Sequence, residues 1–337
     1  MSFRRALWIG TALTALVCGV AVVSTIRHSL SPANPDAESV VFQVERGQTL
    51  GTIANNLERA GLIRDERALI WIAEFQGVAN SLRAGEYRLS PADTPQEILG
   101  RITAGAVETH LLVVPEGFTA RQIAERLEEI GLADSKEFQQ VVRDRDLVTS
   151  LELEGDGLEG YLFPETYRIP RGLPAEEVAS VLTREFKRNW RLIESRAAKR
   201  GMSMREVVTL ASIVEKETSD PDERPLIASV FHNRLARGMR LETDPTVIYG
   251  IPNFDGNLRR KDLENRENPY NTYRIPGLPP GPIASPGAEA LMAVVEPAQS
   301  DYLYFVSRND GTHKFSRTYA EHRVAVNEFQ RRRSRRN

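Results

Sequence analysis

Carboxylic side chains are the strongest candidates for chemistry in this sequence. Five of them lie beside apolar residues, at the ends of predicted elements or in loops: Glu159, Glu165, Glu215, Glu217 and Asp244. A carboxyl group acts as a general acid near neutral pH only when its removal from water raises its pKa. Apolar neighbours can provide that removal. The sequence therefore indicates carboxylate chemistry at one or more of these positions.

Other kinds of active site lack the residues that they need. The sequence contains no nucleophile-elbow, Walker or dinucleotide-binding glycine motif. Its five histidines follow neither the spacing of a helix face nor that of a chelate: His28, His110, His232, His313 and His322. The single cysteine, Cys18, excludes an internal disulfide framework and a cysteine-based zinc site. We therefore expect no metal and no cofactor.

Length and charge limit the organisation of the chain and its partners. With 337 residues, the chain is long enough for two or three folded units. Lys and Arg number 44 and Asp and Glu number 46, so the formal net charge is -2 at pH 7. A chain with balanced charge does not attract a polyanion over distance. Nucleic acid is therefore not an expected partner.

The acids Glu215 and Glu217 end a predicted helix over residues 205–217. At about 100° per residue the two acids fall on opposite shoulders of one apolar stripe. The stripe consists of Val207, Leu210, Ala211, Val214 and Thr218. Helical geometry alone therefore leaves both acids open as the reactive group. It also leaves open that both, with Lys216, form a solvated polar helix end.

The N-terminal segment has the composition of a membrane-spanning helix. Residues 6–26 are 21 residues without a charge, preceded by Arg5 and followed by Arg27. This length matches a bilayer core and exceeds the roughly 7–15 apolar residues of a cleaved signal peptide. We predict a single transmembrane helix at 6–26, a cytoplasmic stub at 1–5 and a body outside the membrane. A cleaved leader and a lipoprotein anchored at Cys18 are the alternatives.

Two copies of one local pattern follow the predicted linker at residues 27–39. Gly47-Gln48-Thr49 with its downstream apolar residues is repeated 70 positions later by Gly117-Phe118-Thr119. Each copy predicts a strand, a turn and a helix with a threonine N-cap, Thr49 or Thr119. The strands are expected at 40–44 and 111–114, with a further strand at 85–89. Chance similarity between two strand-turn-helix units is the alternative.

The remaining pattern predicts an α+β protein. Helices are expected at 174–200, 205–217 and 225–237. Beyond Gly238 we expect loops rich in Pro, Gly, Asn and Tyr, then a strand at 302–306 and a final helix from Tyr319. Long irregular loops within a compact domain are usually functional. The predicted fold is a small α+β subdomain followed by a mixed α/β domain with long loops.

The first folded unit, predicted at residues 40–108, resembles the LysM family of glycan-binding modules. The resemblance lies in Val44-Glu45-Arg46-Gly47-Gln48-Thr49-Leu50, Ile53-Ala54 and Leu82-Arg83-Ala84-Gly85-Glu86-Tyr87. Residues 61–80 depart from the common LysM pattern. An ordinary α+β spacer is the alternative, and glycan binding by this unit does not follow from the fold.

The second unit, predicted at residues 109–337, resembles the YceG-like family of endolytic murein transglycosylases. The matching segments are 158–167, 211–218, 230–235, 239–250, 270–273 and 277–283. The resemblance implies a lyase that cleaves the MurNAc-GlcNAc β-1,4 bond of nascent strands, leaves 1,6-anhydroMurNAc ends and terminates elongation. It also implies a single-pass protein of the inner membrane with a periplasmic catalytic domain.

The same resemblance assigns the catalytic role to Glu217. Seven further residues are candidates to line the glycan groove, where they would hydrogen-bond sugar groups or stack on sugar faces: Glu159, Glu165, Asp244, Thr246, Tyr249, Asn271 and Tyr273. For each of these a structural role, such as capping a turn, is the alternative. The implied partners are glycan strands, the membrane and peptidoglycan synthases. A non-catalytic cell-wall scaffold that recruits synthases is the alternative from another functional class.

One carboxyl group suffices for the implied reaction. Most glycosidases use two carboxyl groups, because one of them acts on the leaving oxygen and the other on water or on the anomeric carbon. In a lytic transglycosylase, Glu217 would protonate the glycosidic oxygen and then accept the proton of the C6 hydroxyl of the same sugar. Intramolecular attack supplies the proximity that a second carboxylate would otherwise provide.

Overall fold

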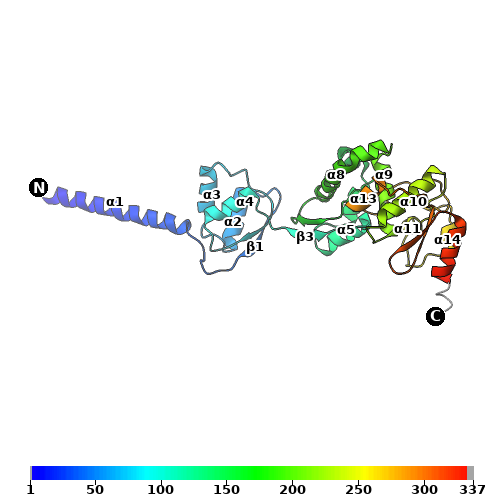
Figure 1. Ribbon diagram of the computed structural model, residues 1–337. Helices are drawn as coiled ribbons and strands as arrows, with labels where there is room; N and C mark the ends of the chain where they lie inside the picture. Colours follow the sequence, from blue (N-terminus) through cyan, green and yellow to red (C-terminus); the bar gives the residue numbers. More distant parts are fainter. Residues whose placement is uncertain (1, 332–337) are drawn as a thin grey trace. The chain divides into compact units, whose positions relative to one another are not determined.

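The computed structural model describes residues 2–331, with the side chains of residues 2–12, 15 and 331 left out. The chain forms two compact units (Figure 1). The N-terminal unit ends at His110 and also includes Pro170–Gly172, and the C-terminal unit comprises the residues from Leu111 onward apart from those three. The predicted domain boundaries, at residues 40, 108 and 109, stay predictions. The architecture is α+β with small sheets, in agreement with the predicted class.

The first element is one long helix, α1 (Ser2–Ser29). It contains the segment predicted to span the membrane, residues 6–26. Within the described residues, no helix combines the length and the apolar character that crossing a membrane requires. The predicted anchor is therefore not confirmed, and the side chains of residues 6–12 and 15 lie outside the described part of the chain.

The N-terminal unit continues with a strand, two helices, a strand and a helix: β1 (Val40–Val44), α2 (Leu50–Arg59), α3 (Glu66–Phe75), β2 (Gly85–Leu89) and α4 (Pro95–Ala104). The two strands pair antiparallel, with Val40 opposite Leu89 and Val44 opposite Gly85. Tyr87, Leu57 and Leu69 are fully buried between the sheet and the helices. Both predicted strands are confirmed, whereas α3 and α4 were not predicted. A LysM-like identity stays a prediction.

The threonine N-caps of the repeated pattern are confirmed. The Oγ1 atom of Thr49 accepts from the amide of Thr52, and that of Thr119 accepts from the amide of Gln122, each at 3.2 Å. Such a bond satisfies one of the backbone donors that a helix start leaves unpaired. At Thr119 the side chain of Gln122 also accepts from the Thr119 amide, which completes a capping box.

The C-terminal unit contains more helix than strand. In chain order it comprises β3 (His110–Val113), α5 (Ala120–Glu129), α6 (Ser135–Val142), α7 (Arg145–Ser150), β4 (Thr166–Ile169), α8 (Ala175–Lys199), α9 (Met204–Glu217), α10 (Arg224–Ala236), α11 (Asp244–Tyr249), α12 (Arg260–Glu264), α13 (Ala288–Val295), β5 (Tyr304–Ser307), β6 (His313–Ser316), α14 (Tyr319–Val326) and η1 (Asn327–Arg331). Strand β3 pairs with β4, and β5 pairs antiparallel with β6.

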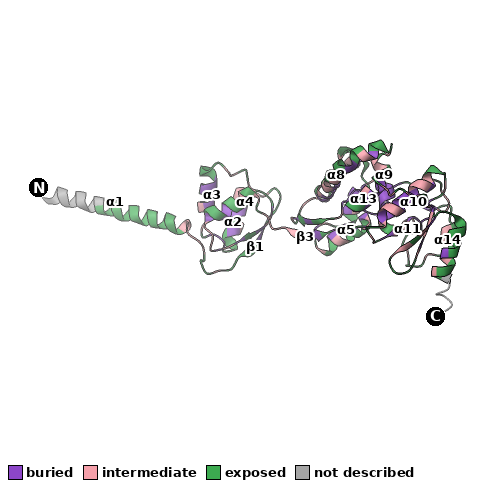
Figure 2. Cartoon of the chain, viewed as in Figure 1, coloured by how far each residue is buried: buried purple, intermediate pink, exposed green. Residues whose placement is uncertain are grey.

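Helix α9 lies at the centre of the C-terminal unit. It packs against α8, α10, α11 and α13, and every residue from Val207 to Val214 is buried (Figure 2). The residues of the predicted apolar stripe are all buried, and burial also extends to the other faces of the helix because neighbouring helices cover them. A capping box between Ser203 and Glu206 fixes its start. Glu215 and Glu217, in the last turn of α9, consequently lie directly at the edge of the buried core.

The predicted helices at 174–200, 205–217 and 225–237 are confirmed as α8, α9 and α10 within two residues at each end. The prediction of loops throughout the region after Gly238 is wrong, since α11, α12 and α13 lie there. Helix α11 has a proline in its first turn, and α13 is a short, almost wholly apolar helix. Neither gives the extended periodic pattern from which a helix is predicted. Residues 265–287 do form a long segment without helix or strand.

Gly160, directly after Glu159, fixes the path of the chain against α9. Its φ of +84° favours glycine, and a Cβ atom there would lie 2.5 Å from Cβ of Pro282. Gly172 has a similar φ of +75° but open space around it. We predict that Gly172→Ala costs about 1 kcal/mol from backbone strain alone. Gly160→Ala should cost at least about 1 kcal/mol more, because it also overpacks the core.

The midpoint of urea unfolding of each variant measures this difference. Equal losses of stability in the two variants would show that close packing at Gly160 is unimportant.

Candidate functional site

Glu217 is the last residue of α9, and its side chain is partly buried. Its Oε1 atom accepts a hydrogen bond from the hydroxyl of Thr243, the N-cap residue of α11. Burial raises the pKa of Glu217 to about 7, although the Thr243 hydroxyl lowers it. The charge of Asp244 raises this pKa further, whereas His313 and Arg234 lower it. The carboxyl group therefore populates both protonation states near neutral pH.

Two other buried threonines, Thr246 and Thr272, hold Thr243 at this position. The amide of Thr243 donates to Oγ1 of Thr272 at 3.1 Å, and the Thr246 hydroxyl donates to the Thr243 carbonyl at 2.8 Å. The hydroxyls of Thr246 and Thr272 lie 2.8 Å apart. Thr246 and Thr272 are fully buried. Thr246 was predicted to line a groove, but its hydroxyl instead ties the start of α11 to residues 271–273.

Asp244 and Tyr273 lie beside this network and pair with each other. The Tyr273 hydroxyl donates to Oδ1 of Asp244 at 2.7 Å. Burial raises the pKa of Tyr273, and the neighbouring Asp244 and Glu217 carboxylates add to that rise. The structure thus brings the predicted residues Glu217, Asp244 and Tyr273 into one electrostatic neighbourhood. Asp244 is exposed, so this neighbourhood opens to solvent.

Glu215, the other acid of α9, belongs to an ion-pair cluster. Its side chain is 6% exposed, and Oε1 lies 3.2 Å from Nη2 of Arg224. Its Oε2 atom accepts from the amide of Gly287 at 3.0 Å. Arg224 also pairs with Glu116 and Glu289. Burial raises the pKa of Glu215, while Gly287 and Arg224 oppose that rise. The proposed solvated helix end is therefore wrong for this acid.

A second partly buried acid, Glu159, lies at a cavity of about 910 Å³. Its Oε1 atom accepts from the amide of Ala120 at 3.0 Å and its Oε2 atom from the Tyr249 hydroxyl at 3.1 Å. Burial raises the pKa of Glu159 to about 7 against these hydrogen bonds. Tyr249 packs edge-on against Tyr270, with 4.7 Å between ring centroids. Glu159 and Tyr249, both predicted site residues, therefore share one site.

The two remaining predicted residues have different surroundings. Asn271 is fully buried, and its side-chain amide donates to the carbonyls of Asp262, Leu263 and Asn265. It therefore folds the preceding loop and does not face a groove. Glu165 is exposed and accepts from the amide of Thr166 at 2.8 Å. None of the contacts found among the described residues links it to Glu217 or Glu159.

The sequence model of the YceG-like family matches residues 42–328 of the chain. This chain belongs to the YceG-like family. The endolytic murein transglycosylase of Bacillus subtilis (strain 168) is 31% identical over 319 residues, which cover 89% of this chain and 88% of that protein. The protein of the same name from Streptococcus pneumoniae (strain R6) is 30% identical, over 84% of this chain and 57% of its own length.

A solved structure supports the fold of the YceG-like protein. The 2.6 Å crystal structure of a yceG-like protein from Listeria monocytogenes superposes with a TM-score of 0.59 and 32% sequence identity. The match covers 85% of this chain and 98% of that chain.

Sequence reasoning missed several residues around Glu217 in this YceG-like protein. Nδ1 of His313 lies 2.6 Å from Oε2 of Glu223, and the His313 amide donates to the other Glu223 oxygen at 2.8 Å. Arg234 is buried and donates to the carbonyls of Leu303 and Leu241. His313 lies 96 positions after Glu217, so no local spacing could have linked the two.

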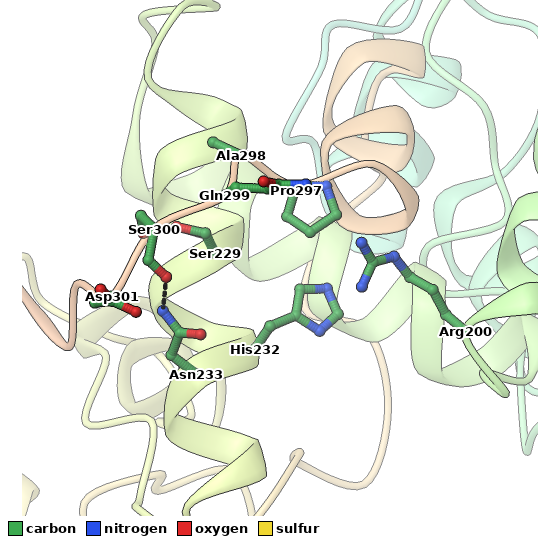
Figure 3. Close-up of a pocket in the computed structure, with 9 residues that line it drawn as sticks. All are labelled: Arg200, Ser229, His232, Asn233, Pro297, Ala298, Gln299, Ser300 and Asp301. Atoms are coloured by element: carbon green, nitrogen blue, oxygen red, sulfur yellow. Dashed lines mark hydrogen bonds between the residues drawn. The ribbon is translucent and has the colours of Figure 1, made fainter.

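A separate cavity of about 490 Å³ lies between α10 and residues 297–301 (Figure 3). Most of its polar side chains bind the backbone of its own wall. Asn233 donates to the carbonyl of Ser300 at 2.8 Å, and Nε2 of His232 lies 2.8 Å from the carbonyl of Val294. These contacts fix the segment after α13 onto α10. The polar side chains of this cavity therefore have a structural role.

Metal binding finds no support in the described residues. No group of three or more His, Cys, Asp or Glu side chains there could hold a metal ion.

The raised pKa of Glu217 predicts a pH-dependent loss of stability. A carboxyl with an ordinary pKa near 4.5 in the unfolded chain and about 7 in the folded protein keeps its proton on folding between these values. The free energy of unfolding therefore falls as pH rises from 4.5 to 7. Glu217→Gln lacks this titrating group. The difference between its melting temperature and that of wild type should therefore rise with pH from 4.5 to 7 and level off above pH 7.

Thermal melts of both proteins between pH 4 and 8 measure this difference. Glu165→Gln, which changes an exposed carboxyl, provides the control. A difference between Glu217→Gln and wild type that is independent of pH would contradict the assignment.

Proposed function

We propose that this YceG-like protein is a lytic transglycosylase that cleaves the glycan strands of peptidoglycan in the bacterial cell envelope. The environment of Glu217 carries the proposal. Its carboxyl has a pKa of about 7 and a single hydroxyl donor, and among the described residues it forms no ion pair. A general acid at neutral pH needs these properties. The relatives named endolytic murein transglycosylases supply the substrate class.

The choice between the two acids of α9 rests on their partners. Glu215 forms an ion pair with Arg224 and accepts from the Gly287 amide, and protonating it would give up both charge-assisted contacts. Glu217 has only the Thr243 hydroxyl, which can donate to the carboxylate and can remain in contact with the protonated acid. These contacts support Glu217 as the catalytic residue.

The proposed reaction breaks the β-1,4 bond between MurNAc and GlcNAc. Glu217 donates its proton to the glycosidic oxygen, and GlcNAc leaves with that oxygen. The Glu217 carboxylate then accepts the proton of the MurNAc C6 hydroxyl as its oxygen bonds to C1. The product carries a 1,6-anhydroMurNAc end, which cannot be elongated. No water is consumed, so one carboxyl group serves both steps.

The finer proposal for location is a single-pass anchor at residues 6–26 with the catalytic unit outside the inner membrane. The run of 21 uncharged residues supports it. The order strand, helix, helix, strand of the N-terminal unit supports a LysM-like module. Such an anchor would bring the enzyme to strands as synthases release them, and we propose peptidoglycan synthases as partners on that ground.

Product analysis tests the reaction and the acid together. Purified strands incubated with the protein should yield 1,6-anhydro ends, which lack the mass of one water relative to hydrolysis products. Glu217→Gln should reduce the rate of their formation about 1000-fold, because a general acid typically contributes a factor of this order. Glu215→Gln, which keeps the shape of the buried acid, should retain product formation with reduced stability.

Mass spectrometry of the released fragments measures both outcomes. Reducing ends without mass loss would indicate hydrolysis, and loss of product in Glu215→Gln alone would transfer the role to Glu215.

The pH dependence of kcat/KM provides a further prediction. Since Glu217 must be protonated to begin the reaction, kcat/KM should fall as pH rises through about 7. The Thr243 hydroxyl lowers this pKa, so Thr243→Val should move the fall in kcat/KM to higher pH. Initial rates at low substrate concentration across pH 5–9 measure the shift. A fall at the same pH in both proteins would show that Thr243 does not act on the essential acid.

A further inference from the structure

The cavity at Glu159 adjoins the site of Glu217. Pro245, Ile248 and Tyr249 of α11 line the cavity, and the N-cap of the same helix, Thr243, binds Glu217. Lys216, the residue before Glu217, also lines it. Helix α11 and the end of α9 are therefore walls shared between the cavity and the proposed catalytic site.

Both cations and acids line the cavity: Arg121, Arg143, Arg205 and Lys216, with Glu154, Asp156 and Glu159. Its two other carboxylates, Glu154 and Asp156, are engaged by Arg205, through its backbone amide at 2.9 Å and its guanidinium at 3.4 Å respectively. Arg145 also pairs with Asp156 at 2.9 Å. Arg121 pairs with Glu125 at 4.0 Å, and Lys216 donates one N–H to the carbonyl of Gly117 at 3.2 Å. Arg143 and the remaining N–H groups of Lys216 are therefore the cationic donors that can face a ligand. The lining therefore favours an anionic group.

One part of the cavity wall, formed by residues 248–254 and Tyr270, is mainly apolar and aromatic. Ile248, Ile251, Pro252 and Phe254 line it, together with the paired rings of Tyr249 and Tyr270. The neutral hydroxyl and acetamido groups of the sugars bind a cation more weakly than a carboxylate does. A short peptide with free carboxylates and aliphatic side chains matches both parts of the lining.

Glu159 adds the group that a peptide backbone requires. Its carboxyl oxygens face donors, since both accept hydrogen bonds, from Ala120 and Tyr249. Each oxygen of a carboxyl group has two acceptor positions, so the group can accept from a further amide N–H in the cavity. No cation forms an ion pair with Glu159 among the residues described. Its remaining acceptor capacity suits a neutral donor such as an amide.

We propose that this cavity binds the acidic peptide stem attached to the muramic acid of the substrate, with its carboxylates at Arg143 and Lys216 and its amides at Glu159. This inference rests on the proposed function, because only a peptidoglycan substrate brings such a peptide beside Glu217. The cavity thereby makes the enzyme selective for strands that still carry their peptides. Arg143 is a specificity residue in this arrangement and takes no part in bond cleavage.

The test compares two substrates: strands with their peptide stems, and the same strands after an amidase has removed the stems. The wild-type protein should show a higher kcat/KM on peptide-bearing strands. Arg143→Ala should lower the ratio of the two kcat/KM values about 10-fold, as expected for one lost charge-assisted contact. Arg191→Ala, on the exposed face of α8 and outside the cavity lining, should keep the wild-type ratio.

A direct binding measurement complements the kinetics. Glu217→Gln titrated calorimetrically with a soluble N-acetylmuramoyl tripeptide should bind it, and the double variant with Arg143→Ala should bind about 10-fold more weakly. An unchanged substrate ratio in Arg143→Ala would overturn the peptide site while leaving the proposed function intact. Absence of cleavage of either substrate by the wild-type protein would overturn the proposed function and the peptide site together.

Discussion

The burial of residues 207–214 of helix α9 is the constraint on which the site depends. Residues 207–214 contact protein on all sides, so the position and rotation of this helix are fixed by α8, α10, α11 and α13. Its last turn emerges where the chain is still largely shielded from water. Desolvation is consequently the largest cause of the raised pKa at Glu215 and at Glu217. The core thus supplies the condition that turns a glutamate into an acid for neutral pH.

The acids differ in the partners of their carboxyl groups. Glu215 receives a guanidinium and an amide, and removing either partner would leave a buried charge uncompensated. Glu217 and Glu159 each receive neutral donors, and both have a pKa raised to about 7. Of these three acids, one is thus held in an ion-pair cluster, and the other two are carboxyl groups with a raised pKa and neutral hydrogen-bond donors. Perturbed groups of the second kind cluster at functional sites.

Much of the local structure could be predicted from sequence because its causes are local. The caps at Thr49 and Thr119, the strands at residues 40–44 and 85–89, and the helices at 174–200 and 225–237 all follow from short-range patterns. The short helices α11 and α13 could not be predicted, because packing on α9 stabilises them. The same holds for the site. Glu217 and Glu159 were named as candidates, but the burial of Asn271 and the nearness of His313 to Glu217 arise from tertiary contacts.

Helix α11 also sets the distance between its contact with Glu217 and its contact with Glu159. Thr243 at its N-cap touches Glu217, and Tyr249 at its last position touches Glu159. Six residue steps at a rise of about 1.5 Å each separate these contacts by about 9 Å along the helix axis. Because successive helical residues are rotated by about 100°, inserting or deleting one residue in α11 would turn Tyr249 away from Glu159 while leaving Thr243 in place. The helix is therefore a fixed spacer whose residue count, as much as its composition, determines how far apart the two carboxyl groups meet a substrate.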